Sequence, residues 1–171
     1  MKTIYILEDS TVVAELLKFN LKEDFNCRVR CFDNSVDLFD YMLLSKVKKP
    51  DLIILDHFID NELKENGLNI LKKLKIYNHN IPVIMFSGQH SLQLAVELIH
   101  AGAADYIDKN EDSFLEDINQ SVRTLFKYYD TVNQLSVANE QVLLDQKQFI
   151  GEVFLSFLFL VSLITLLQIV C

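Results

Sequence analysis

Residues 51–56, with the sequence DLIILD, constrain the fold of this chain more than any other stretch. Pro50 precedes a continuous apolar run that ends at Asp56. A run of this length is typical of a strand buried on both faces, as in the middle of a parallel sheet. In open α/β sheets, ligands bind at the carboxyl ends of the strands, so Asp56 is expected to face such a site. The alternative is that Asp56 only caps the helix that follows.

Similar apolar stretches recur along the chain, and helical patterns separate them. Strands are predicted at residues 2–7, 27–32, 52–56, 81–86 and 105–108, and helices at 10–23, 35–45, 67–77, 92–101 and from residue 113. Ser10 is expected to cap the first helix. Regular alternation of strand and helix predicts right-handed crossovers with helices on both faces of the sheet. We therefore expect an α/β, flavodoxin-like, doubly wound five-stranded parallel sheet of order 2-1-3-4-5.

Composition excludes several classes of function. The net charge of −8 disfavours nucleic acid as a partner, because binding to its backbone phosphates needs basic side chains. The chain has only four glycines, too few and too scattered for a Gly-rich phosphate loop. Cys27 and Cys31 are expected to lie on one side of a strand as small apolar residues, and a metal pair is the less favoured alternative. Free thiols fit a reducing cytosol, and we expect no N-terminal signal sequence.

Polar residues follow the strands at the positions that would converge at one edge of this sheet. Glu8 and Asp9 follow the first strand, Asp56 ends the third, Ser87 follows the fourth and Lys109 the fifth. Clustered carboxylates need a cation, and oxygen ligands of this kind suit Mg²⁺. Together the residues supply a nucleophile, a metal site, a hydrogen-bond donor and a cation for phosphoryl transfer. Taken singly, each could be a solvated strand end, a turn residue or a surface lysine.

These motifs carry a resemblance to a known family. They are ILED at 6–9, DLIILD at 51–56, PVIMFSG at 82–88 and AGAADYIDK at 101–109. Through them, residues 1–127 resemble the receiver domain of response regulators in two-component phosphorelays, of the chemotaxis-regulator kind.

The resemblance implies that Asp56 accepts a phosphoryl group from a sensor histidine kinase or a phosphotransfer protein. It further implies that Glu8, Asp9, Asp56 and the Phe58 carbonyl hold Mg²⁺, and that Ser87 and Lys109 contact the phosphoryl group. Ser87 and Tyr106 would then switch a surface that binds an output partner, which the sequence does not name. Such a chain catalyses only its own phosphorylation and dephosphorylation and is not otherwise an enzyme.

Two positions depart from the pattern of that family. Asp60 stands where proline is common, and Gly67 comes three residues late, so an insertion is expected at 61–66. Asn110 replaces the usual proline after Lys109, which leaves open whether this peptide bond is cis. His57 is next to Asp56, but its side chain is expected to alternate away from the pocket.

Residues 128–150 are predicted to form a helical stalk. Apolar residues at Val132, Leu135, Val142 and Phe149 follow a coiled-coil spacing, but Asn139 and Gln146 interrupt it. A homodimer paired through this stalk and a solvated single helix both remain open.

Residues 151–171 are predicted to form a transmembrane helix, because 153–171 are 19 residues without a charge. We expect this helix to anchor the receiver to the cytoplasmic face of the inner membrane; a helix buried in soluble protein is the alternative. A pseudo-receiver scaffold that is never phosphorylated is the second reading of function. An aspartate-nucleophile phosphatase of the haloacid dehalogenase kind would need Asp at position 58, where this chain has Phe.

Overall fold

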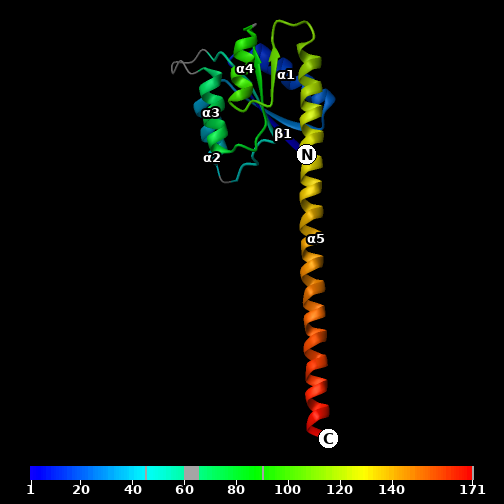
Figure 1. Ribbon diagram of the computed structural model, residues 1–171. Helices are drawn as coiled ribbons and strands as arrows, with labels where there is room; N and C mark the ends of the chain where they lie inside the picture. The colour runs from blue at the N-terminus through cyan, green and yellow to red at the C-terminus, as the bar shows by residue number, and fades with distance from the viewer. Residues whose placement is uncertain (45, 60–65, 90, 171) are drawn as a thin grey trace. The chain divides into compact units, whose positions relative to one another are not determined.

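The computed structural model describes residues 1–44, 46–59, 66–89 and 91–170; within the last range the side chains of 161 and 163–170 are not described. The predicted insertion therefore lies largely outside the described residues. Strands and helices alternate along the chain (Figure 1). The elements are β1 (Lys2–Leu7), α1 (Thr11–Asp24), β2 (Cys27–Phe32), α2 (Ser35–Leu43), β3 (Leu52–Asp56), α3 (Gly67–Tyr77), β4 (Val83–Ser87), α4 (Leu92–His100), β5 (Asp105–Asp108) and α5 (Phe114–Val170).

The strands form one five-stranded sheet in the order β2-β1-β3-β4-β5, and all of its pairings are parallel. This confirms the predicted flavodoxin-like sheet and its strand order. β3 is buried along its whole length, as its continuous apolar run predicts. The order in which strands are added along the sheet reverses between β1 and β3, so a crevice is expected at their carboxyl ends.

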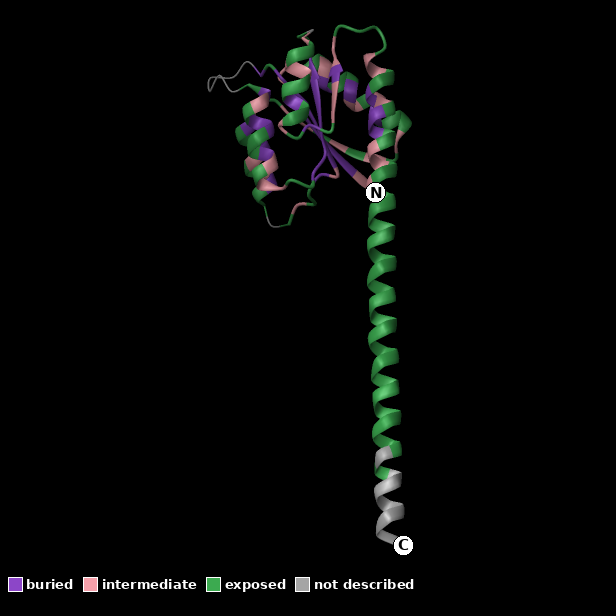
Figure 2. Ribbon diagram, viewed as in Figure 1, coloured by how far each residue is buried: buried purple, intermediate pink, exposed green. Residues whose placement is uncertain are grey.

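Helices cover both faces of the sheet, and the sheet lies buried between them (Figure 2). One face carries a core of alternate strand residues packed with residues of α2, α3 and α4, including Leu38, Leu71 and Leu98. On the other face lie α1 and the first turns of α5, which an amide pair joins: Asn20 Nδ2 donates to Asn119 Oδ1 over 2.7 Å.

Most strands and α3 have the predicted ends, and the other elements differ from the predicted ends by one or two residues. Ser10 occupies the N-cap position of α1, but its side chain makes no capping bond. Asn34, Asn66 and Ser91 do cap their helices by accepting a backbone N–H three residues on. β4 begins two residues later than predicted because Pro82 has no N–H to donate to a ladder.

The chain divides into two compact units, Met1–Leu125 and Phe126–Cys171. We call the first the receiver unit. The second is helical, and its described side chains from Asp130 to Leu160 are all exposed. Within the described residues, no helix is apolar over a length sufficient to span a bilayer. The predicted span reaches beyond these, because the side chains of 161 and 163–171 are not described.

Candidate functional site: an acidic cluster with a half-buried lysine

The candidate site lies where β1 and β3 end, and the register of the sheet creates it. Leu7 pairs with Leu55, so the next residues, Glu8 and Asp56, emerge side by side. Both are buried, with 3 % and 4 % of their surface exposed. Asp9 is the more accessible third member. Oxygen atoms of these three carboxylates all lie within 4.8 Å of one another.

Burial of Glu8 and Asp56 disfavours the charged form of both carboxyl groups. It raises the pKa of Glu8 and of Asp56 above the ordinary range for carboxyl groups, because a charged carboxylate loses solvation in the protein interior. The neighbouring negative charge raises each pKa further, while hydrogen bonds and charge from Lys109 lower it. The cluster is thus a set of oxygen ligands that gains from a cation, which fits a hard divalent ion such as Mg²⁺.

Lys109 supplies a cation at the centre of the cluster. Its Nζ lies 2.6 Å from Glu8 Oε2 and 2.9 Å from Asp56 Oδ2, so it bridges the two buried carboxylates. Its backbone N–H donates to the Ser87 carbonyl over 2.8 Å, which fixes the end of β5 against the end of β4. Its ammonium group also lies over the Phe86 ring, with Nζ 4.8 Å from the ring centroid. The lysine is therefore held from both ends.

The second oxygen of Asp56 is also held. Asp56 Oδ1 accepts the backbone N–H of Phe58 over 3.1 Å. Gly67 packs directly on this turn: a Cβ added to it would lie 2.6 Å from the Asp56 carbonyl oxygen and 2.6 Å from His57 Cα. The start of α3 thus approaches the end of β3 more closely than any side chain allows, and sequence reasoning missed this role of Gly67.

Ser87 and Tyr106 are linked through one backbone residue. Ser87 is fully buried, and its Oγ accepts the N–H of Gln89 over 3.1 Å. The Gln89 carbonyl in turn accepts the Tyr106 hydroxyl over 2.5 Å. Burial raises the pKa of that hydroxyl. The two residues predicted to act as the switch are therefore joined, and the connecting role of Gln89 has no signal in the sequence because it uses backbone atoms alone.

The remaining sequence expectations have mixed outcomes. His57 is buried and its Nδ1 has no hydrogen-bond partner; burial lowers its pKa, so the ring is a neutral core residue. Phe58 is 55 % exposed, and its carbonyl remains a predicted ligand. The Lys109–Asn110 peptide is trans, since the described residues contain no cis peptide bond. Cys27 and Cys31 are both free and half-buried.

Comparisons with known proteins agree with this geometry. A family model described as the response regulator receiver domain matches residues 4–123. The response regulator protein TmoT of Ectopseudomonas mendocina is 28% identical over 131 residues, which are 72% of this chain and 52% of TmoT. TodT of Pseudomonas putida is 32% identical over 113 residues, 62% of this chain and 44% of TodT. The chain spans about half the length of these curated relatives.

Solved structures give the same result. The signal receiver domain assigned to a Luxo repressor protein from Vibrio parahaemolyticus superposes with a TM-score of 0.67 at 26% identity, covering 78% of this chain and 96% of that one. The BeF3-activated DrrB receiver domain, at 18% identity and a TM-score of 0.63, shares the fold over 74% of this chain and 98% of its own. Through residues 4–123, the chain belongs to the response regulator receiver domain family.

Proposed function

We propose that this chain is a phosphorylation-controlled switch that accepts a phosphoryl group on Asp56. The observation that carries the proposal is the position of Lys109 Nζ, 2.9 Å from Asp56 Oδ2 and 2.6 Å from Glu8 Oε2 within an acidic cluster. A buried carboxylate beside a fixed cation is placed both to attack a phosphorus atom and to have the product's negative charge neutralised. The donor would be a sensor histidine kinase or a phosphotransfer protein, because these carry the group on a histidine.

The proposed reaction is a transfer from a phosphohistidine of the donor to Asp56. A carboxylate oxygen of Asp56 attacks the phosphorus of a phosphohistidine, a P–O bond forms, the P–N bond breaks, and the imidazole leaves. Lys109, 2.9 Å from Asp56 Oδ2, would contact the new phosphoryl oxygens. The Ser87 hydroxyl accepts the Gln89 N–H and could donate its own proton to one of these oxygens. Asp56 must be ionised to attack; burial raises its pKa, and Lys109 lowers it, so the lysine favours the reactive form.

Glu8, Asp9 and Asp56 fit a magnesium ion by their chemistry, since all three offer hard oxygen atoms within 4.8 Å. The Phe58 carbonyl would be a further ligand. When bound, the ion would neutralise the charge of an incoming phosphoryl group. Beyond its own phosphorylation and dephosphorylation we propose no enzymatic activity for the chain.

Labelling tests the assignment. The full chain, purified in a neutral detergent, is incubated with radiolabelled acetyl phosphate and Mg²⁺. We expect acid-stable but alkali-labile label that disappears in Asp56→Asn and is strongly reduced in Lys109→Ala, while Lys72→Ala, an exposed lysine on α3, labels normally. Label on another residue, or equal labelling of the Asp56 variant, would contradict the proposal.

The switching surface is proposed to lie over α4 and β5. Tyr106 is on β5 and hydrogen-bonds the β4–α4 connection through Gln89, so a change at Ser87 can reach this face. Phosphorylation shifts the population only if the active form binds the phosphoryl group better. Amide NMR shifts on adding beryllofluoride are expected along 92–100 and 105–108. Shifts confined to residues 8, 9 and 56–58 would refute this route, and the output partner remains to be identified.

A pseudo-receiver scaffold is the alternative, and the labelling assay separates the two. A scaffold needs neither an ionised Asp56 nor a lysine held between two carboxylates. Its partner binding would be the same for the native chain and for Asp56→Asn, with and without acetyl phosphate.

We further propose that the C-terminal segment tethers the receiver to the cytoplasmic face of the inner membrane. The support is compositional: residues 153–171 carry no charge over 19 positions. The phosphodonors depend on cytoplasmic ATP, which favours that side. Fractionation tests this: the full chain should stay with membranes through carbonate extraction, and a chain ending at Gln148 should not. Extraction of both would refute the tether.

A homodimer through the stalk is proposed from the spacing of its apolar residues. A repeat of alternating four- and three-residue steps passes through Val132, Leu135, Asn139, Val142 and Gln146 and continues to Phe149. Four of these six positions are apolar, and an Asn at a single inner position of such a repeat can specify the register and the oligomeric state. The apolar side chains of the repeat are exposed on this helix. An isolated helix gains little stability without packing, so a second copy that covers these side chains would stabilise it. Cysteine at 139 should crosslink to its copy under mild oxidation, whereas cysteine at the outer position 137 should not.

A further inference from the structure

A second group of charged side chains lies away from the acidic cluster and lines a cavity of about 560 Å³ in the receiver unit. The cavity is bounded by β1, β2, the end of α1, and the segment after α2. Its charged lining residues are all cations, namely Lys22, Arg28, Arg30, Lys46 and Lys48. We call it the basic pocket. No carboxylate lines it, although the chain as a whole carries a net charge of −8.

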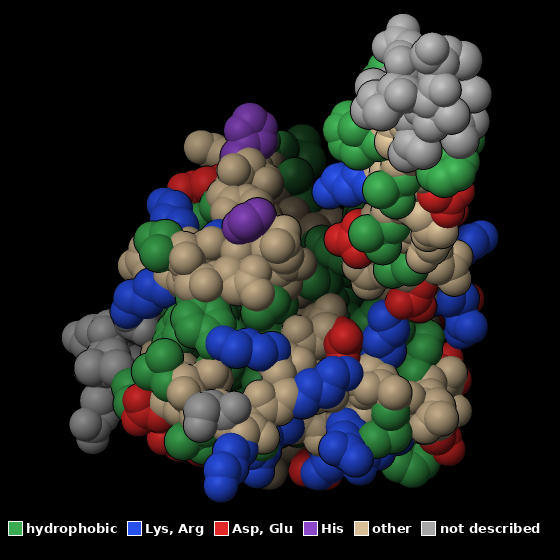
Figure 3. Space-filling model, turned by 90° about the horizontal axis from the view of Figure 1, so that it is seen from below, with side chains coloured by type: hydrophobic (Ala, Val, Ile, Leu, Met, Phe, Trp, Pro, Cys, Tyr) green, Lys and Arg blue, Asp and Glu red, His purple; other side chains and the backbone are tan. Residues whose placement is uncertain are grey.

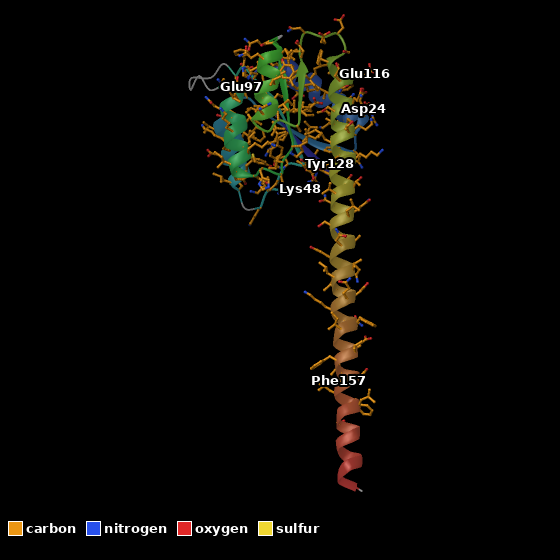
Figure 4. All side chains as sticks on the ribbon, in the orientation of Figure 1. Asp24, Lys48, Glu97, Glu116, Tyr128 and Phe157 are labelled. Carbon is orange, nitrogen blue, oxygen red and sulfur yellow. The ribbon has the colours of Figure 1, made fainter. Side chains whose placement is uncertain are left out.

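The register of the sheet places the two arginines together. Thr3 pairs with Arg28 and Tyr5 with Arg30, so these four alternate residues lie on one face of the β1–β2 edge. The pocket is at the end of the receiver unit where β1 begins. Figure 4 labels Lys48 near that end and Glu116 near the opposite one. Figure 3, viewed from below, shows Lys and Arg side chains gathered on this face of the unit.

Interactions within the lining fix parts of its wall. The Tyr5 hydroxyl donates to the Lys48 carbonyl over 2.8 Å, which holds the segment after α2 against the sheet. The Arg30 guanidinium lies 3.8 Å from the centroid of the Tyr41 ring, a cation–π contact that orients it and leaves its N–H groups available.

The protein neutralises only part of the pocket's positive charge. Lys48 pairs with Asp51 over 2.8 Å. Of the other four cations, none has a carboxylate within 4.0 Å in the part of the chain that the structure describes. Thr3, only 7 % exposed, also lines the pocket, and its buried hydroxyl has no hydrogen-bond partner. Surplus cations and an unsatisfied hydroxyl are features that an anionic ligand would complete.

We propose that the basic pocket binds the phosphate groups of a ligand that carries at least two negative charges. Guanidinium groups match phosphate oxygens with paired N–H donors, and a concave wall concentrates the positive potential. The volume is in the range of small-molecule sites. Both a soluble phosphorylated molecule and a phospholipid headgroup carry this chemistry.

Titration with inorganic pyrophosphate tests the site. The full chain is held in neutral detergent without divalent cations, so that the acidic cluster repels the probe. The variant Arg28→Gln/Lys46→Gln removes two exposed cations of the pocket; Lys72→Gln/Arg123→Gln removes the same charge elsewhere. We expect affinity to fall about tenfold or more in the first variant, a loss of roughly 1.4 kcal/mol, and little in the second. Equal losses, or no binding by the native chain, would overturn the proposal.

Competition then distinguishes the source of the phosphate. Displacement of pyrophosphate by short-chain phosphatidic acid but not by glycerol phosphate supports a lipid headgroup, and equal displacement by both supports a soluble ligand. Short-chain phosphatidylcholine, which has no net charge, should not displace pyrophosphate. A DNA duplex that binds more tightly than pyrophosphate, with the same sensitivity to the pocket variant, would overturn a small phosphate ligand as the occupant.

Discussion

Replacing Lys109 by methionine should destabilise the receiver unit, and by an amount that depends on pH. Methionine keeps an unbranched apolar side chain and removes the ammonium group, whose Nζ lies 4.8 Å from the Phe86 ring centroid. Glu8 and Asp56, whose side chains are 2 % and 4 % exposed, would then lose their cation. Breaking a buried ion pair by removing one partner costs about 3–5 kcal/mol. Lys109 is 20 % exposed, so we expect a value near the lower end, about 3 kcal/mol at neutral pH.

The pH dependence follows from the direction of the pKa shifts. Lys109 lowers the pKa of both Glu8 and Asp56, so its removal raises both further. The loss of stability is therefore complete where the carboxylates are ionised, and shrinks as pH falls through their raised pKa values, because protonated carboxyls need no cation. Saturating Mg²⁺ should also narrow the difference, since an ion bound only by the folded state stabilises it.

Urea unfolding of the full chain, followed by tyrosine fluorescence, measures this difference in free energy of unfolding. Lys72→Met, an exposed lysine on α3, is the matched control and should change stability by less than about 0.5 kcal/mol. A loss under about 1 kcal/mol, or one that persists unchanged in acid, would show that Lys109 does not stabilise the cluster electrostatically.

Three further predictions concern the same end of the sheet. Gly67→Ala should cost about 3 kcal/mol in thermal unfolding, because its Cβ would lie 2.6 Å from backbone atoms of Asp56 and His57; an unchanged midpoint would refute the close packing. The native chain should lose stability as pH falls below the ordinary histidine pKa, because burial lowers the pKa of His57 and only the unfolded chain then takes up a proton. His57→Leu should abolish this loss, which urea midpoints measured across that pH range would show. Tyr106→Phe removes the hydroxyl bonded to Gln89 and should cost about 1 kcal/mol in urea unfolding while weakening the NMR response of α4 to beryllofluoride; a full response would refute the link.

Strand order and the convergence of the strand ends could be predicted from sequence because each depends on pattern alone. The apolar run into Asp56 predicts a central buried strand, and the alternation of elements then leaves few topologies. Once β1 and β3 are neighbours, Glu8 and Asp56 must meet. The cap at Ser10 shows the limit of such reasoning, since the residue has the right position but its hydroxyl makes no bond.

Which side chains pair within the converging strand ends could not be predicted in the same way. Lys109 was expected to meet a phosphoryl oxygen, and sequence gave no sign that it also bridges Glu8 and Asp56. The basic pocket was missed for a similar reason. Its cations come from α1, β2 and the segment after α2, where each taken alone reads as an ordinary surface residue.

The link between Ser87 and Tyr106 has a consequence for how tolerant position 89 is to change. The backbone N–H of Gln89 donates to Ser87 Oγ, and its carbonyl accepts the Tyr106 hydroxyl. Only the φ and ψ torsions of Gln89 separate the two groups, so a shift of the backbone at one hydrogen bond is passed to the other over a single residue. The side chain takes no part in either bond. Other side chains at position 89 would therefore keep both hydrogen bonds. Proline is the exception, because it lacks the backbone N–H that donates to Ser87.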